Sequence, residues 1–109
     1  MATTYKVLGQ VNPPATTVTP VYTVPSSTSA IISTISVCNQ AATNATFRIA
    51  VQPAGITIAA KHYINYDTSV LANDTIYLTL GITLATTDVI SIYTSSSTIS
   101  VSVFGTELS

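Results

Sequence analysis

The sequence contains several short segments in which apolar residues alternate with threonine or serine, on an almost uncharged background. In the last one, Ile99, Val101 and Val103 alternate with hydroxyl residues. Consecutive side chains of a β-strand point to opposite faces of a sheet, so this alternation is typical of strands with one buried face. The same pattern covers residues 46–52 and 75–80. The sequence therefore predicts an all-β protein.

About eight strands are predicted along the chain. They are expected at residues 5–8, 18–24, 30–38, 46–52, 62–66, 75–80, 89–93 and 98–104. Their even spacing, without a helical period, indicates an antiparallel sandwich or barrel rather than parallel βαβ units. The chain has no tryptophan and only one cysteine, and so lacks two hallmarks of immunoglobulin domains. We therefore favour an eight-stranded, jelly-roll-like sandwich, although the residues alone leave an immunoglobulin-like topology open.

The chain is predicted to be one β-sandwich domain over residues 17–109, preceded by a distinct segment at residues 1–16. Pro13 and Pro14 lack backbone donors, so no strand ladder should continue through them. Residues 1–16 are therefore expected to form either an N-terminal arm or an edge strand followed by a turn.

Two strands have expected positions in their sheets. The segment 18–24 contains Pro20, which is tolerated at a sheet edge or at a bulge. The segment 30–38 is the longest apolar-rich strand and is expected to be central.

The connections are predicted from turn residues. Asp67 is expected to end one strand and Gly81 another, and Ser95, Ser96 and Ser97 are expected to form a hairpin link. Residues 56–60 are the only candidate for a helical turn, although their Ile-Thr-Ile sequence favours a strand.

Charged residues make up only 6% of the chain, against about a quarter in ordinary domains. They are Lys6, Arg48, Lys61, Asp67, Asp74, Asp88 and Glu107. With 20 threonines and 13 serines, the solvent-facing surface should consist mostly of hydroxyl groups. Such a surface repels copies of itself weakly and is easily desolvated, so it suits a protein that docks to copies of itself or to a larger assembly.

The same composition argues against two classes of partner. Binding to nucleic acid needs several clustered lysines or arginines, and this chain has three scattered ones. No apolar run approaches the roughly 18 residues needed to cross a bilayer. The N-terminal residues do not resemble a secretory signal, so we expect the chain to fold in a cytosol or to be a mature form.

The sequence offers little for catalysis or for binding a cofactor. His62 is the only histidine and Cys38 the only cysteine, whereas a zinc site needs three or four ligands. His62 is expected to be a structural strand residue, and Cys38 a buried, inert one. We therefore predict no catalytic residue, no metal site and no cofactor, and we expect the protein not to be an enzyme.

Tyrosine is the enriched residue type with a potential role in binding. The candidate interface residues are Tyr5, Tyr22, Tyr63, Tyr66 and Tyr77. An outward tyrosine can anchor a protein interface or stack on a sugar, and it can also simply fill the rim of the core. Tyr77 is expected on the hydroxyl face of its strand, and Tyr63 and Tyr66 on opposite faces of theirs.

The chain also resembles small virion proteins of tailed bacteriophages, particularly those that infect cyanobacteria and related hosts. The resemblance extends over nearly the whole chain and contains no catalytic motif. It is carried by TTYKVLGQ near the start, YTVP at 22–25, residues 35–39, ATFRIAV at 45–51, HYINYD at 62–67, ANDTIYLTLGITL at 72–84 and VFGTEL at 103–108.

This resemblance implies a structural protein of the phage particle, made in the host cytoplasm. Jelly-roll decoration, or cement, proteins of this kind sit as trimers on the capsid lattice and clamp neighbouring capsid subunits. The implied partners are the major capsid protein, other virion proteins and further copies of the chain. An accessory module of the tail, neck or baseplate is an alternative, and a carbohydrate-binding or adhesive β-sandwich is a second.

Overall fold

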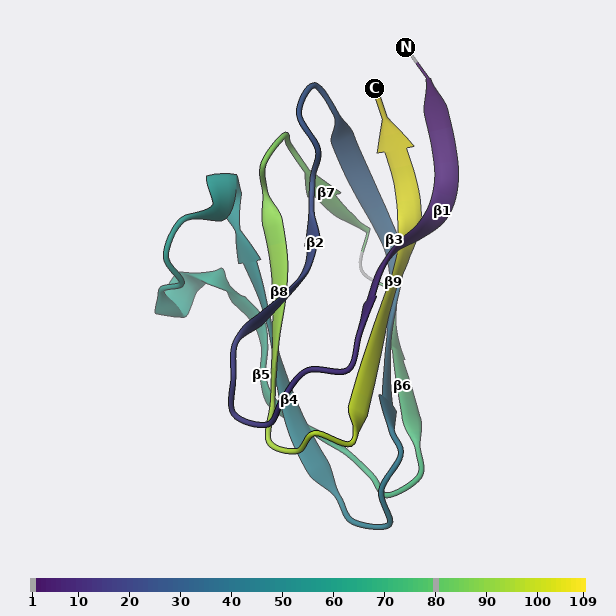
Figure 1. Cartoon of the computed structure of the whole chain (residues 1–109), viewed down its shortest axis with the longest axis vertical. Helices are drawn as coiled ribbons and strands as arrows, with labels where there is room; N and C mark the ends of the chain where they lie inside the picture. The colour runs from purple at the N-terminus through teal and green to yellow at the C-terminus, as the bar shows by residue number, and fades with distance from the viewer. Residues whose placement is uncertain (1, 80) are drawn as a thin grey trace.

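The structure is a computed structural model that describes residues 2–79 and 81–109. Within these residues the chain forms two antiparallel sheets, which pack against each other as a sandwich (Figure 1). The strands are β1 (Thr3–Val11), β2 (Thr19–Thr23), β3 (Ser29–Asn39), β4 (Ala45–Gln52), β5 (Tyr63–Val70), β6 (Thr75–Leu78), β7 (Ile82–Leu84), β8 (Val89–Thr94) and β9 (Ile99–Leu108). Two 3-10 turns, η1 (Pro53–Gly55) and η2 (Ala60–His62), lie between β4 and β5. The predicted all-β sandwich is confirmed.

The order of the strands in the two sheets is that of a jelly roll. The first sheet has the order β1-β9-β3-β6, and β7 also pairs with β3. The second sheet has the order β2-β8-β4-β5. Because β6 and β7 pair with opposite ends of β3, together they fill one strand position, and each sheet has four positions. The chain passes to the other sheet after β1, β2, β3, β5, β7 and β8. This alternation, with the last strand between β1 and β3, is the double Greek key of a jelly roll.

The core lies between the two sheets and is built from the alternating apolar residues. In β9, Ile99, Val101 and Val103 are buried, while Ser100 and Ser102 are only half-buried on the opposite face. Side chains from the second sheet, such as Phe47, meet them in one apolar cluster. The predicted alternation is thus confirmed in β9 and, as far as Ile49, in β4, whereas Ala50 is buried and Val51 is only half-buried. Leu80, which the pattern also assigns to a strand, lies outside the described residues.

The positions predicted for two strands are also confirmed. β3 is the longest strand and pairs with β9 on one side and with β6 and β7 on the other. β2 is at an edge of the second sheet, and its register with β8 shifts between Pro20 and Tyr22. Proline lacks a backbone N–H donor. It is tolerated in β2 because an edge strand with an irregular register does not need that donor.

Residues 3–11 form an edge strand of the first sheet. β1 pairs with β9 from Thr3 opposite Leu108 to Val11 opposite Val101, and the two chain ends lie side by side (Figure 1). Next to the strand, the side-chain amide of Asn12 donates to the carbonyls of Ser97 and Ile99, at 2.9 and 2.7 Å. Gly9 brings β1 close to β2, since a Cβ at this position would lie 2.3 Å from the carbonyl oxygen of Val21.

The link between β8 and β9 is not the predicted hairpin. β8 belongs to the second sheet and β9 to the first, so residues 95–97 cross between the sheets. The backbone N–H of Ser95 still donates to Thr46 in β4, at 2.9 Å. Three residues later, the carbonyl of Thr98 accepts from Gln40, next to β3. The serines thus mark a crossing, which resembles a hairpin turn in local sequence only.

One predicted strand end and one predicted turn also differ, and one strand was not predicted. β5 continues through Asp67, which adopts a positive φ of 51° inside the strand. Gly81 is followed by a further strand, β7, which the sequence did not predict. The turn expected within residues 56–60 begins at Ala60 and includes His62, which is therefore not a strand residue.

Candidate functional site

A group of aromatic and charged side chains lies on the outer face of the second sheet. We call it the aromatic cluster, and it consists of Arg48, Tyr63, Tyr66, Asp67 and Tyr93. Arg48 comes from β4 and lies opposite Tyr93 of β8 in the register of the sheet. The other three residues come from β5, at the edge of the same sheet.

Two register shifts in β5 bring Tyr63 and Tyr66 together. Ala50 pairs with Tyr63, Ile49 pairs with Asn65, and Phe47 pairs with Thr68, so β5 contains extra residues opposite β4. Each such bulge resets the alternation of side chains. The ring centroids of Tyr63 and Tyr66 are consequently 5.1 Å apart, with an interplanar angle of 87°. The prediction that these two tyrosines point to opposite faces is therefore wrong.

Arg48 lies between two tyrosine rings and is held by an acid. Its guanidinium carbon is 4.1 Å from the centroid of Tyr66 and 4.5 Å from that of Tyr93. Its Nε and Nη2 donate to the two carboxylate oxygens of Asp67, at 2.7 and 3.2 Å. These hydrogen bonds lower the pKa of Asp67 and raise that of Arg48. The bidentate pair and the stacked rings fix the planar guanidinium, and with it the ring of Tyr66.

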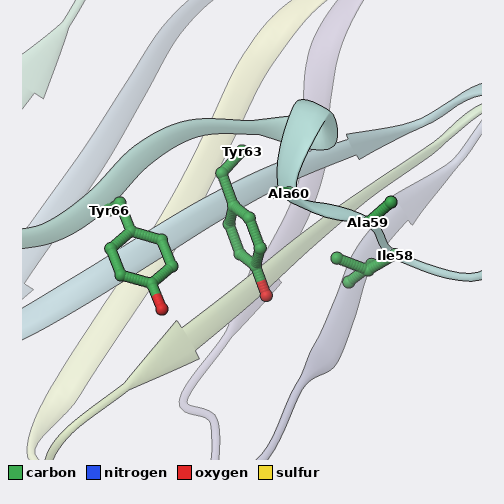
Figure 2. Close-up of a pocket in the computed structure, with 5 residues that line it drawn as sticks. All are labelled: Ile58, Ala59, Ala60, Tyr63 and Tyr66. Carbon is green, nitrogen blue, oxygen red and sulfur yellow. The ribbon is translucent and has the colours of Figure 1, made fainter.

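An open cavity of about 480 Å³ lies beside the two tyrosines of β5. It is lined by Ile58, Ala59, Ala60, Tyr63 and Tyr66 (Figure 2). Figure 2 shows both phenol rings extending from β5 on the same side, with their hydroxyl groups pointing in a similar direction. The cavity thus has an apolar wall from the β4–β5 connection and an aromatic wall from β5.

The connection that forms the apolar wall is tied down by hydrogen bonds. The amide of Gln52 donates to the carbonyl of Ile56 at 2.9 Å, and the backbone N–H of Ala54 donates to Asp88 at 2.8 Å. Nearer to the cavity, the backbone N–H of Ala59 donates to Nδ1 of His62 at 2.8 Å. These bonds hold the long connection in one conformation against the sandwich.

His62 has a structural place next to this cavity. Since Nδ1 accepts a hydrogen bond, the proton of the neutral ring is on Nε2. Nε2 is buried and has no hydrogen-bond partner among the described residues. The sequence assigned His62 a structural role in a strand, and the structure places it instead as the last residue of η2, where it closes the turn.

Tyr22, one of the candidate interface residues, lies in the core rather than on an outer face. Its side chain is part of the core, with 7% exposure, and its hydroxyl donates to Glu107 at 2.6 Å. Glu107 also pairs with Lys6 at 2.9 Å. Burial and then the hydrogen bond to Glu107 raise the pKa of Tyr22, and the same bond, together with Lys6, lowers the pKa of Glu107. The sequence could not predict this burial and hydrogen bonding, because Tyr22 lies in the second sheet while Glu107 and Lys6 lie in the first.

The outer face of the first sheet carries the other two tyrosines. Tyr77 is 70% exposed, as predicted from its place on the hydroxyl face of its strand, and Tyr5 is 82% exposed. The register places them in outward rows with partly exposed apolar and hydroxyl residues. These outward positions are Tyr5, Val7 and Gln10 in β1, Ser100, Ser102, Phe104 and Thr106 in β9, Ile31, Thr34, Ser36 and Cys38 in β3, and Thr75, Tyr77 and Thr83 in β6 and β7. We call this surface the uncharged face, because no charged residue occupies these positions.

Cys38 also differs from its prediction. It is half-buried rather than buried, because it lies in an outward row of β3 between Ser100 and Thr75. A thiol there is part of the uncharged face, not of the core.

The described residues contain no group of three or more histidine, cysteine, aspartate or glutamate side chains that could hold a metal ion. In the part of the chain that the structure describes, no helix has the length and apolar character required to span a membrane.

The sequence did not predict that Arg48, Asp67 and Tyr93 belong to a site. One signal was available, since Arg48 is the only arginine in the chain and lies on the polar side of a clear alternation. Its partners could not be found in the same way, because they come from two other strands.

Comparisons of the chain with protein-family models, with curated proteins and with solved structures give no match.

Proposed function

We propose that the protein is a structural subunit of a tailed-bacteriophage particle. Its most specific form is a capsid decoration, or cement, protein, which acts without catalysis as a homotrimer bound to the major capsid protein. The observation that carries the proposal is the uncharged face, which extends across all strands of the first sheet.

The chemistry of this face favours burial against other protein. Four of its large apolar side chains are well exposed in the free chain, namely Tyr5, Val7, Ile31 and Tyr77. The rest of the face is mostly serine and threonine, which can bond to a partner or to trapped water. Covering it would desolvate no charge, so shape and apolar contact can provide the binding free energy.

The fold and the sequence add support from two directions. A jelly roll presents one whole sheet face and leaves β1 as an edge, and an edge strand offers unpaired backbone groups to a neighbour. The resemblance to small virion proteins extends along nearly the whole chain and includes residues of β1, β3, β6 and β9. In this proposal, copies of the chain bury the uncharged face against each other and against the shell, and the added interface resists the pressure of packaged DNA.

The first test is the copy number of the protein in purified particles, measured by quantitative mass spectrometry against the major capsid protein. Near parity with the shell supports decoration. A few copies to a few dozen would retain the structural role and overturn the capsid position in favour of the tail, neck or baseplate. Absence from the particle would overturn the proposal.

A pair of variants tests the surface itself. Ile31 on the uncharged face and Ile64 in β5 of the second sheet have almost equal exposure, 41% and 43%. We expect Ile31→Asp to abolish self-association in sedimentation velocity and binding to shells in co-sedimentation, while Ile64→Asp retains both.

Tyr5→Ser provides a second variant at the edge of the sheet, where the fold is least affected. Equal behaviour of the aspartate variants at 31 and 64, with both folded by circular dichroism, would show that the uncharged face is not the interface.

A further inference from the structure

The cavity beside the aromatic cluster has features that the proposed structural role does not use. It lies on the second sheet, whereas the uncharged face belongs to the first. Its lining combines aliphatic side chains from the connection with two phenol rings from β5 (Figure 2). A ligand in it would therefore meet apolar surface on one side and an aromatic surface with hydroxyl groups on the other.

The residues that line the cavity favour a neutral ligand, although the exposed Lys61 of η2 follows the lining residue Ala60 in the chain. None of the lining residues Ile58, Ala59, Ala60, Tyr63 and Tyr66 is charged. The nearest ion of the cluster, Arg48, donates to both carboxylate oxygens of Asp67, so its charge is already compensated. A phosphate or carboxylate ligand would have to compete with this intramolecular pair.

The site is also preformed. The ring of Tyr66 packs against the guanidinium of Arg48 and lies nearly perpendicular to the ring of Tyr63. The opposite wall is fixed by the bonds from Gln52 to Ile56 and from Ala59 to His62. A ligand therefore gains contact without first ordering a mobile loop.

We propose that this cavity binds a neutral saccharide. A pyranose ring has an apolar face of C–H groups, which packs on an aromatic ring, and equatorial hydroxyls, which exchange hydrogen bonds with phenols and carboxylates. Tyr63 and Tyr66 supply the aromatic surface and two hydroxyl groups. Asp67, whose side chain is 48% exposed beside Tyr66, can accept a bond from a sugar hydroxyl while it still holds Arg48. The cavity volume lies within the range of small-molecule sites.

The test uses the full chain and four probes: the methyl glycosides of glucose, galactose, mannose and N-acetylglucosamine, each at millimolar concentration. Saturation-transfer NMR reports contact of the protein with the sugar protons. Amide shift changes in isotope-labelled protein report the location. We expect at least one glycoside to give transfer, with shift changes confined to residues 58–67 and their neighbours in β4 and β8.

Tyrosine variants distinguish stacking of the sugar on Tyr66 from nonspecific binding. Tyr66→Ala should weaken the binding by about ten-fold, while Tyr66→Phe should retain most of it because the ring remains. Tyr77→Ala is the matched control, since Tyr77 is an even more exposed tyrosine on the other sheet. It should leave the binding unchanged. Tyr63→Ala provides a second lesion in the same cavity, should Tyr66→Ala disturb the fold.

A glycan array then distinguishes the source of the sugar. Binding to free methyl glycosides alone indicates a small-molecule site. Stronger binding to immobilised oligosaccharides indicates recognition of a surface glycan. Both results support the saccharide assignment. The assignment is overturned if none of the four glycosides shows transfer and the array is silent. It is also overturned if the Tyr66→Ala and Tyr63→Ala proteins both bind as tightly as the unaltered protein, or if Tyr77→Ala loses as much binding as Tyr66→Ala.

Discussion

The two outer faces of this sandwich are built from the same few residue types, yet they differ in chemistry. On the first sheet, the outward rows carry hydroxyl and apolar side chains without a charge. On the second sheet, the bulges of β5 bring Tyr63 and Tyr66 together, and the rings of Tyr66 and of Tyr93 in β8 lie against the only arginine of the chain. We propose the first face for broad contact with another protein and the second for a small ligand. The difference shows that strand register can bring side chains together into a local cluster even in a chain with few charged and aromatic residues.

The largest effect is expected where the core supports both faces. Val101 is 2% exposed, so Val101→Asp would place a charge among apolar side chains without a partner. We expect a loss of more than about 4 kcal/mol of the free energy of unfolding, which is enough to prevent folding. The measurement is chemical denaturation followed by circular dichroism.

Ser100→Asp is the matched control, because Ser100 is the neighbouring residue on the uncharged face. The monomer should tolerate it, and self-association should weaken, since the only new charge would lie in the proposed interface. Equal stability of both variants would show that the assigned facing of β9 is wrong.

The next effect concerns the network of Tyr22, Glu107 and Lys6, which joins the two sheets. Tyr22→Phe removes a hydrogen bond to a charged acceptor, Glu107, while the ring still fills the core. We expect a loss of about 1–2 kcal/mol in the free energy of unfolding, measured by urea denaturation. Neither self-association nor sugar binding should change, because this side chain belongs to neither face. A change in association at unaltered stability would contradict the placement of Tyr22 in the core.

The same network predicts a dependence of stability on pH. The pKa of Glu107 is lowered in the folded protein, so its contribution is present above its ordinary value of 4.5 and is lost as the pH falls below it. The pKa of Tyr22 is raised, so its contribution is present below its ordinary value of 10.0 and is lost as the pH rises beyond it. Melting temperatures across the pH range should therefore decline at both ends. Glu107→Gln should flatten the acid side. Tyr22→Phe should flatten the alkaline side and also weaken the acid dependence, because its hydrogen bond is the largest cause of the lowered pKa of Glu107. Unchanged profiles would exclude this linkage.

The smallest effect on stability is expected at the aromatic cluster. Arg48 and Asp67 form a pair at the protein surface, and such pairs contribute little to folding. Arg48→Gln should lower the melting temperature less than Tyr22→Phe does. It should nevertheless weaken saccharide binding, because it frees the ring of Tyr66. Arg48→Lys should behave similarly, since lysine lacks the planar fork that stacks and binds a carboxylate with two bonds. A fall in melting temperature larger than that of Tyr22→Phe would show that the cluster serves the fold.

The candidate site was predictable only in part. Tyr5 and Tyr77 are outward because each lies in a regular stretch where alternation holds. Alternation fails for Tyr63 and Tyr66, because the bulges between them depend on how β5 pairs with β4. Alternation also does not indicate which outward tyrosines contact another side chain. The roles of Arg48 and Tyr93 were therefore not predicted.

The sequence by itself determined the all-β class, the central place of β3, the edge position of β2 at Pro20 and the facing of β9. These properties follow from side-chain period, apolar length and a missing backbone donor, all of which are local to one strand. Only the tertiary structure decided that residues 95–97 cross between sheets, that Tyr22 meets Glu107, and that β5 bulges beneath a cavity. These features depend on pairing between segments far apart in the chain, and a local pattern carries no information about its partner strand.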